Sequence, residues 1–162
     1  KIALAAGPFV SVTGLFVDAD PAFIESVLSD VPLQLLQFHG SESSAYCESF
    51  KRPYMKAIRM RPELDVKAAI SAYPGASGIL LDAYRPGIPG GTGETFDWAR
   101  IPQEVSSPLV LAGGLTPENV GQAVAATRLY GVDVSGGVES EPGKKDHSKL
   151  IAFINNARRC TV

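Results

Sequence analysis

The sequence predicts an α/β fold, a parallel (β/α)8 barrel (TIM barrel) of which this chain holds about six of the eight strand–helix units. Segments with strand character alternate with single segments of helix character, an order typical of βαβ units and parallel pairing. Two strands, residues 78–81 (GILL) and 108–112 (PLVLA), are continuously apolar, as expected for strands covered on both faces. Polar and glycine-rich residues follow the strands, where the active-site loops of a barrel lie.

Six strands can be assigned in order along the chain. They are expected at residues 12–17, 33–38, 54–58, 78–81, 109–112 and 131–134. Helices are expected at residues 21–28, 42–50, 63–72, 117–127 and 146–158. Two of these helices have clear start signals, because Asp20 precedes Pro21 and Thr116 precedes Pro117. In each pair the first residue can cap the helix and the proline can occupy its first position.

The opening residues, 1–7 (KIALAAG), are expected to form the last turn of a helix, because Gly7 is a typical terminator and Pro8 cannot continue the helix. We therefore expect one barrel domain over residues 1–162 that is incomplete at its N-terminus. An open doubly wound sheet is the alternative architecture. The sequence gives it less support, because no G-x-G-x-x-G fingerprint opens an early helix.

Composition argues against several classes of partner. The net charge of −2 and the pI near 5.7 provide no basic stripe for a nucleic acid. The longest apolar runs have the length of strands, so no membrane span is expected. Two distant histidines without a C-x-x-C motif predict no metal site. Two cysteines, Cys47 and Cys160, and the lack of a secretory signal pattern favour the cytoplasm.

A phosphate site is indicated after the last two strands. Each of these strands is followed by a glycine pair, Gly113 with Gly114 and Gly136 with Gly137. Glycines at strand ends let backbone amides approach a ligand, and the last two loops of a barrel are a recurrent phosphate site. One pair alone would be better explained as a tight βα turn. Two pairs in consecutive units favour phosphate binding.

Three titratable residues are candidates for contact with the ligand. Asp82 ends the strand GILL, so we expect its carboxylate at the mouth of the barrel as a general acid, with a loop-bracing role as the alternative. Asp133 is expected inside the last strand, where an inward acid is costly to bury without a partner, so substrate contact or a salt bridge is expected. His39 also follows a strand and can reach the same mouth. His147 is expected to be solvated, and Cys47 to pack inside a helix.

These residues belong to four segments whose order and spacing carry a resemblance to a known family. The segments are 37–40 (QFHG), 80–82 with 90–98 (LLD and GGTGETFDW), 111–120 (LAGGLTPENV), and 132–139 with 142–146 (VDVSGGVE and PGKKD). Together they resemble the phosphoribosylanthranilate isomerases, enzymes of tryptophan biosynthesis that perform an Amadori rearrangement. The similarity runs from Val12 onward.

The resemblance implies an eight-stranded barrel, no cofactor, and a small phosphorylated substrate in which an anthranilate is joined to a 5-phosphoribosyl group. Asp82 matches the general acid of the family, which protonates the furanose ring oxygen and opens the ring to a Schiff base. The expected substrate-binding residues are His39, Asp133, Gly113, Gly114, Ser135, Gly136 and Gly137. A fusion or association with other tryptophan-pathway enzymes is left open.

Two residues that the resemblance implies are not found in this sequence. The general base of the family is a cysteine in a K-I-C-G-I motif on the first strand, and residues 1–4 (KIAL) do not match that motif. Neither Cys47 nor Cys160 has its context. The arginine that follows the second strand and meets the anthranilate carboxylate is also missing. Two other functions therefore stay open: a phosphosugar barrel of the histidine-pathway isomerase type, and a non-catalytic module that binds a phosphometabolite.

Overall fold

The structure is a computed structural model that describes residues 1–83, 95–127 and 129–159. Six strands form one parallel sheet in the order β1-β2-β3-β4-β5-β6. The strands are β1 Thr13–Phe16, β2 Leu35–Phe38, β3 Tyr54–Met60, β4 Gly78–Ala83, β5 Leu109–Leu111 and β6 Gly131–Val132. The predicted α/β class and parallel pairing are confirmed. The strand order follows the chain without reversal, which argues against the doubly wound alternative.

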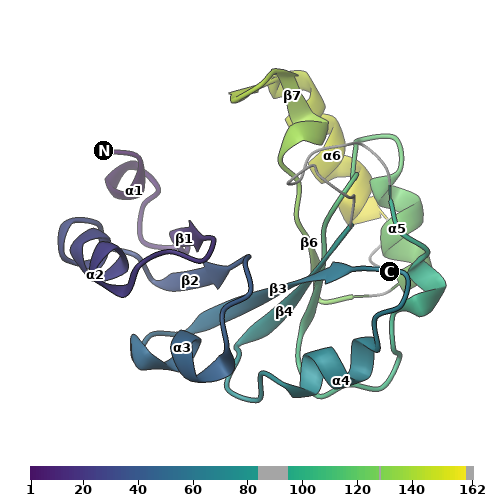
Figure 1. The fold of residues 1–162 in the computed structure, drawn as a ribbon. Helices are drawn as coiled ribbons and strands as arrows, with labels where there is room; N and C mark the ends of the chain where they lie inside the picture. Colours follow the sequence, from purple (N-terminus) through teal and green to yellow (C-terminus); the bar gives the residue numbers. More distant parts are fainter. Residues whose placement is uncertain (84–94, 128, 160–162) are drawn as a thin grey trace.

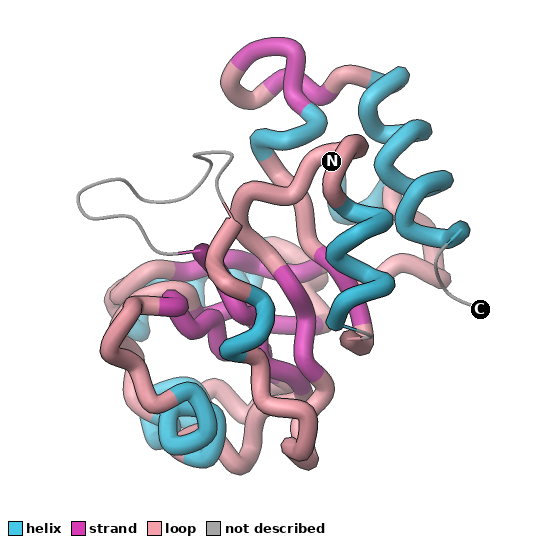
Figure 2. The backbone as a smooth tube through the Cα atoms, turned by 90° about the vertical axis from the view of Figure 1, so that its right-hand side faces the viewer, coloured by secondary structure: helices cyan, strands magenta, loops and turns pink. Residues whose placement is uncertain are grey.

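The helices lie outside this sheet (Figure 1). They are α1 Ile2–Ala5, α2 Pro21–Asp30, α3 Ser44–Ser49, α4 Val66–Ser71, α5 Val120–Thr127 and α6 His147–Arg159, with short 3-10 helices η1 Trp98–Arg100 and η2 Gly136–Val138. Figure 2, turned by 90°, shows the strands running through the middle of the molecule. Strands β1 and β6 are the two edges of the sheet.

Side chains that accept backbone hydrogen bonds start the N-terminal helices. Asp20 caps α2 by accepting from the amide of Ala22 at 2.8 Å, and Pro21 occupies the first helical position as predicted. Ser43 caps α3 and Asp65 caps α4 in the same way. Each cap satisfies an amide that the first turn of a helix leaves without a partner.

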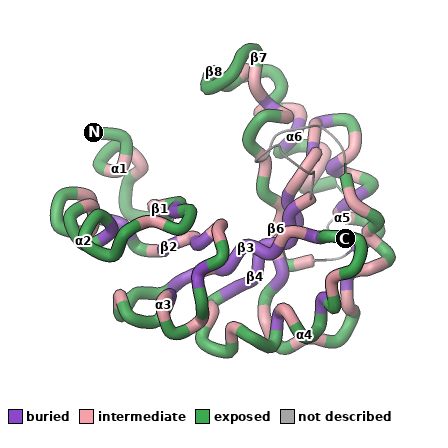
Figure 3. The backbone as a smooth tube through the Cα atoms, in the orientation of Figure 1, coloured by how far each residue is buried: buried purple, intermediate pink, exposed green. Residues whose placement is uncertain are grey.

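The two faces of the sheet carry different residues because side chains alternate along a strand. On β4, Ile79 and Leu81 pack in the cluster that includes residues of α4, α5 and α6. Leu80 instead packs with Ala57 and Ala112. We call the helix-covered side the outer face and the side of Leu80 the inner face. Figure 3 shows that burial is concentrated in the central strands.

Several predicted boundaries were wrong by a few residues. Asp82 does not end its strand, since β4 continues to Ala83. Strand β6 ends at Val132, so Asp133 follows the strand and is exposed rather than buried within it. Helix α5 begins at Val120, because residues 117–119 form a turn before it. The expected helices at 42–50 and 63–72 likewise begin later and are shorter.

An antiparallel hairpin was not predicted. Strands β7 Glu139–Glu141 and β8 Lys144–Lys145 pair beyond η2, joined by a turn in which Gly143 has a φ of 80°. No helix among the described residues is long and apolar enough to span a membrane. The segment 90–94 of the family resemblance, together with Cys160, lies outside the described residues.

Candidate active site

The carboxyl ends of the strands enclose a pocket of about 310 Å³. It is lined by Leu15, Gln37, His39, Asp82, Ala112, Gly113, Gly114, Leu115, Asp133, Val134, Ser135, Gly136 and Gly137. All eight residues that the sequence proposed for the site are in this set. Residues from the ends of five strands, β1, β2, β4, β5 and β6, meet here because parallel strands all end at the same edge of the sheet. The fold therefore brings together residues that lie far apart in the sequence.

His39 and Asp82 form a hydrogen bond across the inner face. Asp82 shares this face with Leu80, two residues earlier on β4, and His39 follows β2 at the same end. The His39 Nε2 atom lies 3.0 Å from Asp82 Oδ2, and the two side chains are only 18% and 12% exposed. Little water competes with this contact, so it fixes the orientation of both groups.

Gln37 sets the proton arrangement of the histidine ring. Its Nε2 lies 3.4 Å from His39 Nδ1. In this arrangement the amide nitrogen of Gln37, which can only donate, faces Nδ1, so a neutral ring would accept at Nδ1 and carry its proton on Nε2. Nε2 then donates to Asp82 Oδ2, which leaves Asp82 Oδ1 as the second oxygen of the carboxyl group. No role was predicted for Gln37 from the sequence, although it stands two residues before His39, where strand alternation places both on one face.

The first glycine pair has a backbone that other residues rarely adopt. Gly113 and Gly114 have φ angles of 81° and 67°, in the left-handed region. A Cβ atom on Gly113 would collide with the amide of Ala83 and lie 2.7 Å from Asp82 Oδ1. Glycine at this position thus allows the loop to pass directly beside the carboxyl group of Asp82.

The two glycine loops pack against each other. A Cβ atom on Gly137 would collide with the carbonyl oxygen of Leu115, in the loop of the first pair. Asn119 stabilises that loop, because its Nδ2 donates to the carbonyl of Gly114 at 2.9 Å and its Oδ1 accepts from the amide of Thr116 at 2.8 Å. These contacts hold the loop against the start of α5, whose turn supplies further backbone amides.

The carboxyl group of Asp133, on the other side of the pocket, has a raised pKa. Partial removal from water by the surrounding protein raises the pKa of its carboxyl group, and the negative charge of Asp82 raises it further. His39 and Lys145 act in the opposite direction and are weaker. Asp133 nevertheless stays exposed, so water screens part of this effect.

Lys145 is a residue near the pocket to which sequence reasoning gave no role. Its Nζ donates to the carbonyl oxygen of Ser135 at 2.9 Å and to Glu139 Oε1 at 2.6 Å. The bond to Lys145 lowers the pKa of Glu139. The unpredicted β7–β8 hairpin thus brings a cation behind the loop of the second glycine pair, Gly136 and Gly137.

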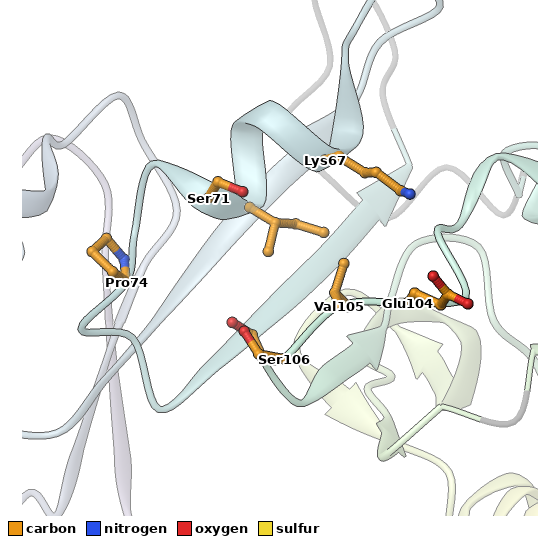
Figure 4. Close-up of a pocket in the computed structure, with 8 residues that line it drawn as sticks. Lys67, Ser71, Pro74, Glu104, Val105 and Ser106 are labelled. Atoms are coloured by element: carbon orange, nitrogen blue, oxygen red, sulfur yellow. The ribbon is translucent and has the colours of Figure 1, made fainter.

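A larger pocket, of about 430 Å³, lies elsewhere (Figure 4). It is formed by α4 and the segment 104–107 that precedes β5, at the amino ends of the strands. Among the described residues that line it, Lys67 and Glu104 carry the charged side chains. Barrel chemistry takes place at the carboxyl ends of the strands, and this pocket has no histidine or paired acids. Size alone does not make it the better candidate.

Comparison with known proteins identifies the family of the chain. The family model described as N-(5'-phosphoribosyl)anthranilate (PRA) isomerase matches residues 1–156. The chain belongs to this family. A relative from Cellvibrio japonicus named N-(5'-phosphoribosyl)anthranilate isomerase is 76% identical over 161 residues, which cover 99% of this chain and 75% of that protein. A relative of the same name from Pseudomonas fluorescens is 57% identical over 98% of this chain and 78% of that protein.

Solved structures of the family have the same fold. Phosphoribosyl anthranilate isomerase from Thermotoga maritima is 39% identical with a TM-score of 0.82, over 98% of this chain and 78% of that chain. Another family structure, solved in complex with reduced 1-(o-carboxyphenylamino)-1-deoxyribulose 5-phosphate, is 36% identical with a TM-score of 0.78, over 98% of this chain and 76% of that chain. The six-stranded sheet described above is accordingly consistent with part of a (β/α)8 barrel.

Cys47 is not suited to the base role that the family resemblance assigns to a cysteine. The side chain is fully buried among the outer-face residues that pack against α2 and α3. Burial raises the pKa of its thiol to about 11. A thiol with this pKa is not a nucleophile or base at neutral pH. The prediction that Cys47 packs in a helix interior is confirmed.

We predict that Gly113→Ala damages both stability and the site. The left-handed backbone and the collisions with Ala83 and Asp82 should together lower the free energy of unfolding by about 2–4 kcal/mol. Gly131→Ala is the matched control, because the nearest atom to its added Cβ is Val110 Cγ2 at 3.8 Å, an ordinary contact. Urea unfolding measures both variants. Equal stability of the two would contradict the close approach of this loop to Asp82.

We predict that Asp133→Asn makes the protein more stable at neutral pH. The raised pKa means that ionised Asp133 is disfavoured in the folded state, a penalty present above the folded pKa and lost as the pH falls below the ordinary pKa of an aspartate. Because Asp133 is exposed, the gain should not exceed about 1 kcal/mol, or roughly 4 °C in melting temperature. Melting curves at neutral and acidic pH measure it, and the gain should vanish in acid. A lower melting temperature at neutral pH would contradict the assigned shift.

Proposed function

We propose that the protein catalyses the Amadori rearrangement of N-(5-phosphoribosyl)anthranilate to 1-(2-carboxyphenylamino)-1-deoxyribulose 5-phosphate, an isomerisation in tryptophan biosynthesis that needs no cofactor. The observation that carries the assignment of the site is the His39–Asp82 hydrogen bond beside two glycine loops, in a member of the PRA isomerase family. The family settles the class of reaction, and the roles given below to single residues are our proposals.

The phosphate group is proposed to bind between the two glycine loops. Gly113 and Gly114 follow β5, and Gly136 and Gly137 follow β6, so both loops present backbone to the same pocket. Backbone amides and the start of α5 favour an anion there, although no lysine or arginine is among the described residues that line the pocket. Ser135 adds a hydroxyl group beside the second loop, and Lys145 adds positive charge behind it.

Asp82 is proposed to act as the general acid that opens the sugar ring. Its Oδ2 accepts from His39, so we assign the transferred proton to Oδ1. This proton goes to the furanose ring oxygen while the bond from that oxygen to C1′ breaks, and the anilino nitrogen supplies the electron pair that forms the Schiff base. Asp82 becomes a carboxylate, which the Nε2 proton of His39 stabilises. Asp133 is proposed to bind the substrate from the other side of the pocket.

The second half of the reaction removes a proton from C2′ to give the enolamine, which then becomes the ketose. Cys47 does not supply that base, because its side chain is fully buried outside the pocket and burial raises the pKa of its thiol to about 11. The chain spans about 75–78% of the length of the curated relatives given above. Experiments on turnover should therefore use the full-length gene product.

The cellular setting is also part of the proposal. We place the reaction in the cytoplasm, in keeping with the low cysteine content and the biosynthetic role. Fusion to or association with other enzymes of the tryptophan pathway stays a prediction from the family resemblance. Co-purification of the tagged full-length protein from its own cells would test it.

We predict that inorganic phosphate binds at the two glycine loops. A crystal grown or soaked with phosphate should show the anion within hydrogen-bond distance of amides among Gly113, Gly114, Gly136 and Gly137, because these loops combine close backbone approach with the start of α5. The larger pocket near Lys67 is the internal comparison. An ordered anion there, with none at the glycine loops, would argue against the assignment.

We predict that Asp82→Asn lowers kcat by at least about a hundredfold, with a smaller change in KM, because an amide cannot donate the proton that opens the ring. Steady-state assays of the full-length enzyme measure both constants. Asp65→Asn is the matched control: Asp65 caps α4, and asparagine caps a helix equally well, so activity should be unchanged. Near-normal turnover of the Asp82 variant would remove Asp82 from the mechanism.

A further inference from the structure

A buried ion pair lies behind the active site, on the outer face of the sheet. Lys56 Nζ is 3.1 Å from Glu42 Oε2, and the two side chains are only 3% and 2% exposed. Lys56 shares the outer face with Tyr54 and Ile58 on β3, so it does not enter the pocket. Burying two charges is costly, and a pair of this kind is weak evidence for stability alone. The other contacts of Lys56 and Glu42 show which part of the backbone the pair binds.

The cation of Lys56 binds the backbone on both sides of His39. Its Nζ donates to the carbonyl oxygen of Phe38 at 3.2 Å and to that of Gly40 at 2.8 Å. The parallel ladder of β2 and β3 ends at the register pair of Phe38 and Lys56, so the lysine continues the pairing with its side chain where the backbone stops. Arg59 donates to the carbonyl oxygen of His39 itself at 3.4 Å.

The carboxylate of Glu42 binds backbone amides in the same region. It accepts from the amide of Gly40 at 2.9 Å and from the amide of Asp18 at 2.8 Å, so it joins the loops after β1 and β2. The amide of His39 donates to the carbonyl oxygen of Phe16 at 2.8 Å. The backbone from residue 38 to residue 40 is thus bound at all three carbonyl groups and at the amides of His39 and Gly40.

We propose that the buried Glu42–Lys56 pair is a positioning device for His39: it fixes the backbone on either side of the histidine and so holds the ring where Nε2 donates to Asp82. Neither residue reaches the pocket, so both act on catalysis only through His39. The catalytic consequence rests on the proposed function, whereas the effect on the histidine ring does not.

The test is the double variant Glu42→Gln/Lys56→Met in the full-length protein. Replacing both charges avoids leaving one buried charge without a partner, and the glutamine keeps an acceptor for the amide of Gly40. We expect kcat to fall at least about tenfold while KM changes less than about threefold, because orientation of the acid is lost and the substrate contacts stay. Circular dichroism confirms folding.

Nitrogen NMR of the histidine rings supplies a second readout that a purely structural role would not move. In the wild type the His39 signal, assigned by its loss in His39→Asn, should show one tautomer with the proton on Nε2. In the double variant it should become a mixture of tautomers. His147, exposed at the start of α6, is the internal reference and should not change.

The matched control makes the same two substitutions at an exposed pair. Lys144 and Glu141 are 3.0 Å apart with side chains 71% and 63% exposed, so Glu141→Gln/Lys144→Met should leave kcat and the His39 signal at wild-type values. A folded Glu42/Lys56 double variant with wild-type kcat and an unchanged His39 signal would overturn the positioning role. If the wild-type enzyme instead lacks isomerase activity, the proposed function fails, and the NMR comparison still decides the positioning role.

If the double variant does not fold, the single variant Glu42→Gln is tested instead. This change keeps the size and the acceptor oxygen and removes only the charge opposite Lys56, so we expect a fall in kcat of about three- to tenfold together with an altered His39 signal. Wild-type kcat and an unchanged signal would overturn the proposal. Failure of both variants to fold would also overturn it, because the pair would then support the whole domain rather than the histidine.

Discussion

The alternation of side chains along parallel strands is the constraint on which the rest of this structure depends. It sends Ile79 and Leu81 into the helix-covered core, and it leaves Leu80 and Asp82 on the inner face. The carboxyl ends of all the strands share one edge, so His39, which follows β2, and Asp82 from β4 meet there. One geometric rule therefore separates the residues that stabilise the sheet from those that line the pocket.

The backbone contributes to the site as much as the side chains do. Left-handed glycines allow the loop after β5 to pass beside the carboxyl group of Asp82, and Gly137 allows the next loop to pack on the carbonyl of Leu115. The anion site that we propose is built from amides, which suits a chain with a net charge of −2, because it adds no basic stripe to the surface. Asp82 and the two glycine loops are packed against one another.

The two faces of the sheet are coupled at the end of β2. His39 presents its ring to the inner face, while the carbonyl groups of Phe38 and Gly40 are bound by Lys56 from the outer face. A charged pair at this place can be tolerated because its remaining hydrogen-bond capacity is used by backbone groups and not left in an apolar core. Positional precision of a catalytic group can thus come from residues that never touch the ligand.

The sequence by itself determined the α/β class, the order of the strands and eight of the thirteen residues that line the pocket. Apolar runs, capping residues and glycine pairs are local signals, and their order matches the family. The predicted ends of β4 and β6 were wrong. A strand ends where pairing with its neighbour stops, and the local sequence does not record that point. Only the tertiary structure decided the proton arrangement through Gln37, the cation of Lys145 behind Ser135, and the Glu42–Lys56 pair under His39. Gln37 and His39 are only two residues apart in the sequence. The other two contacts join residues at least ten positions apart, and only folding brings such residues together.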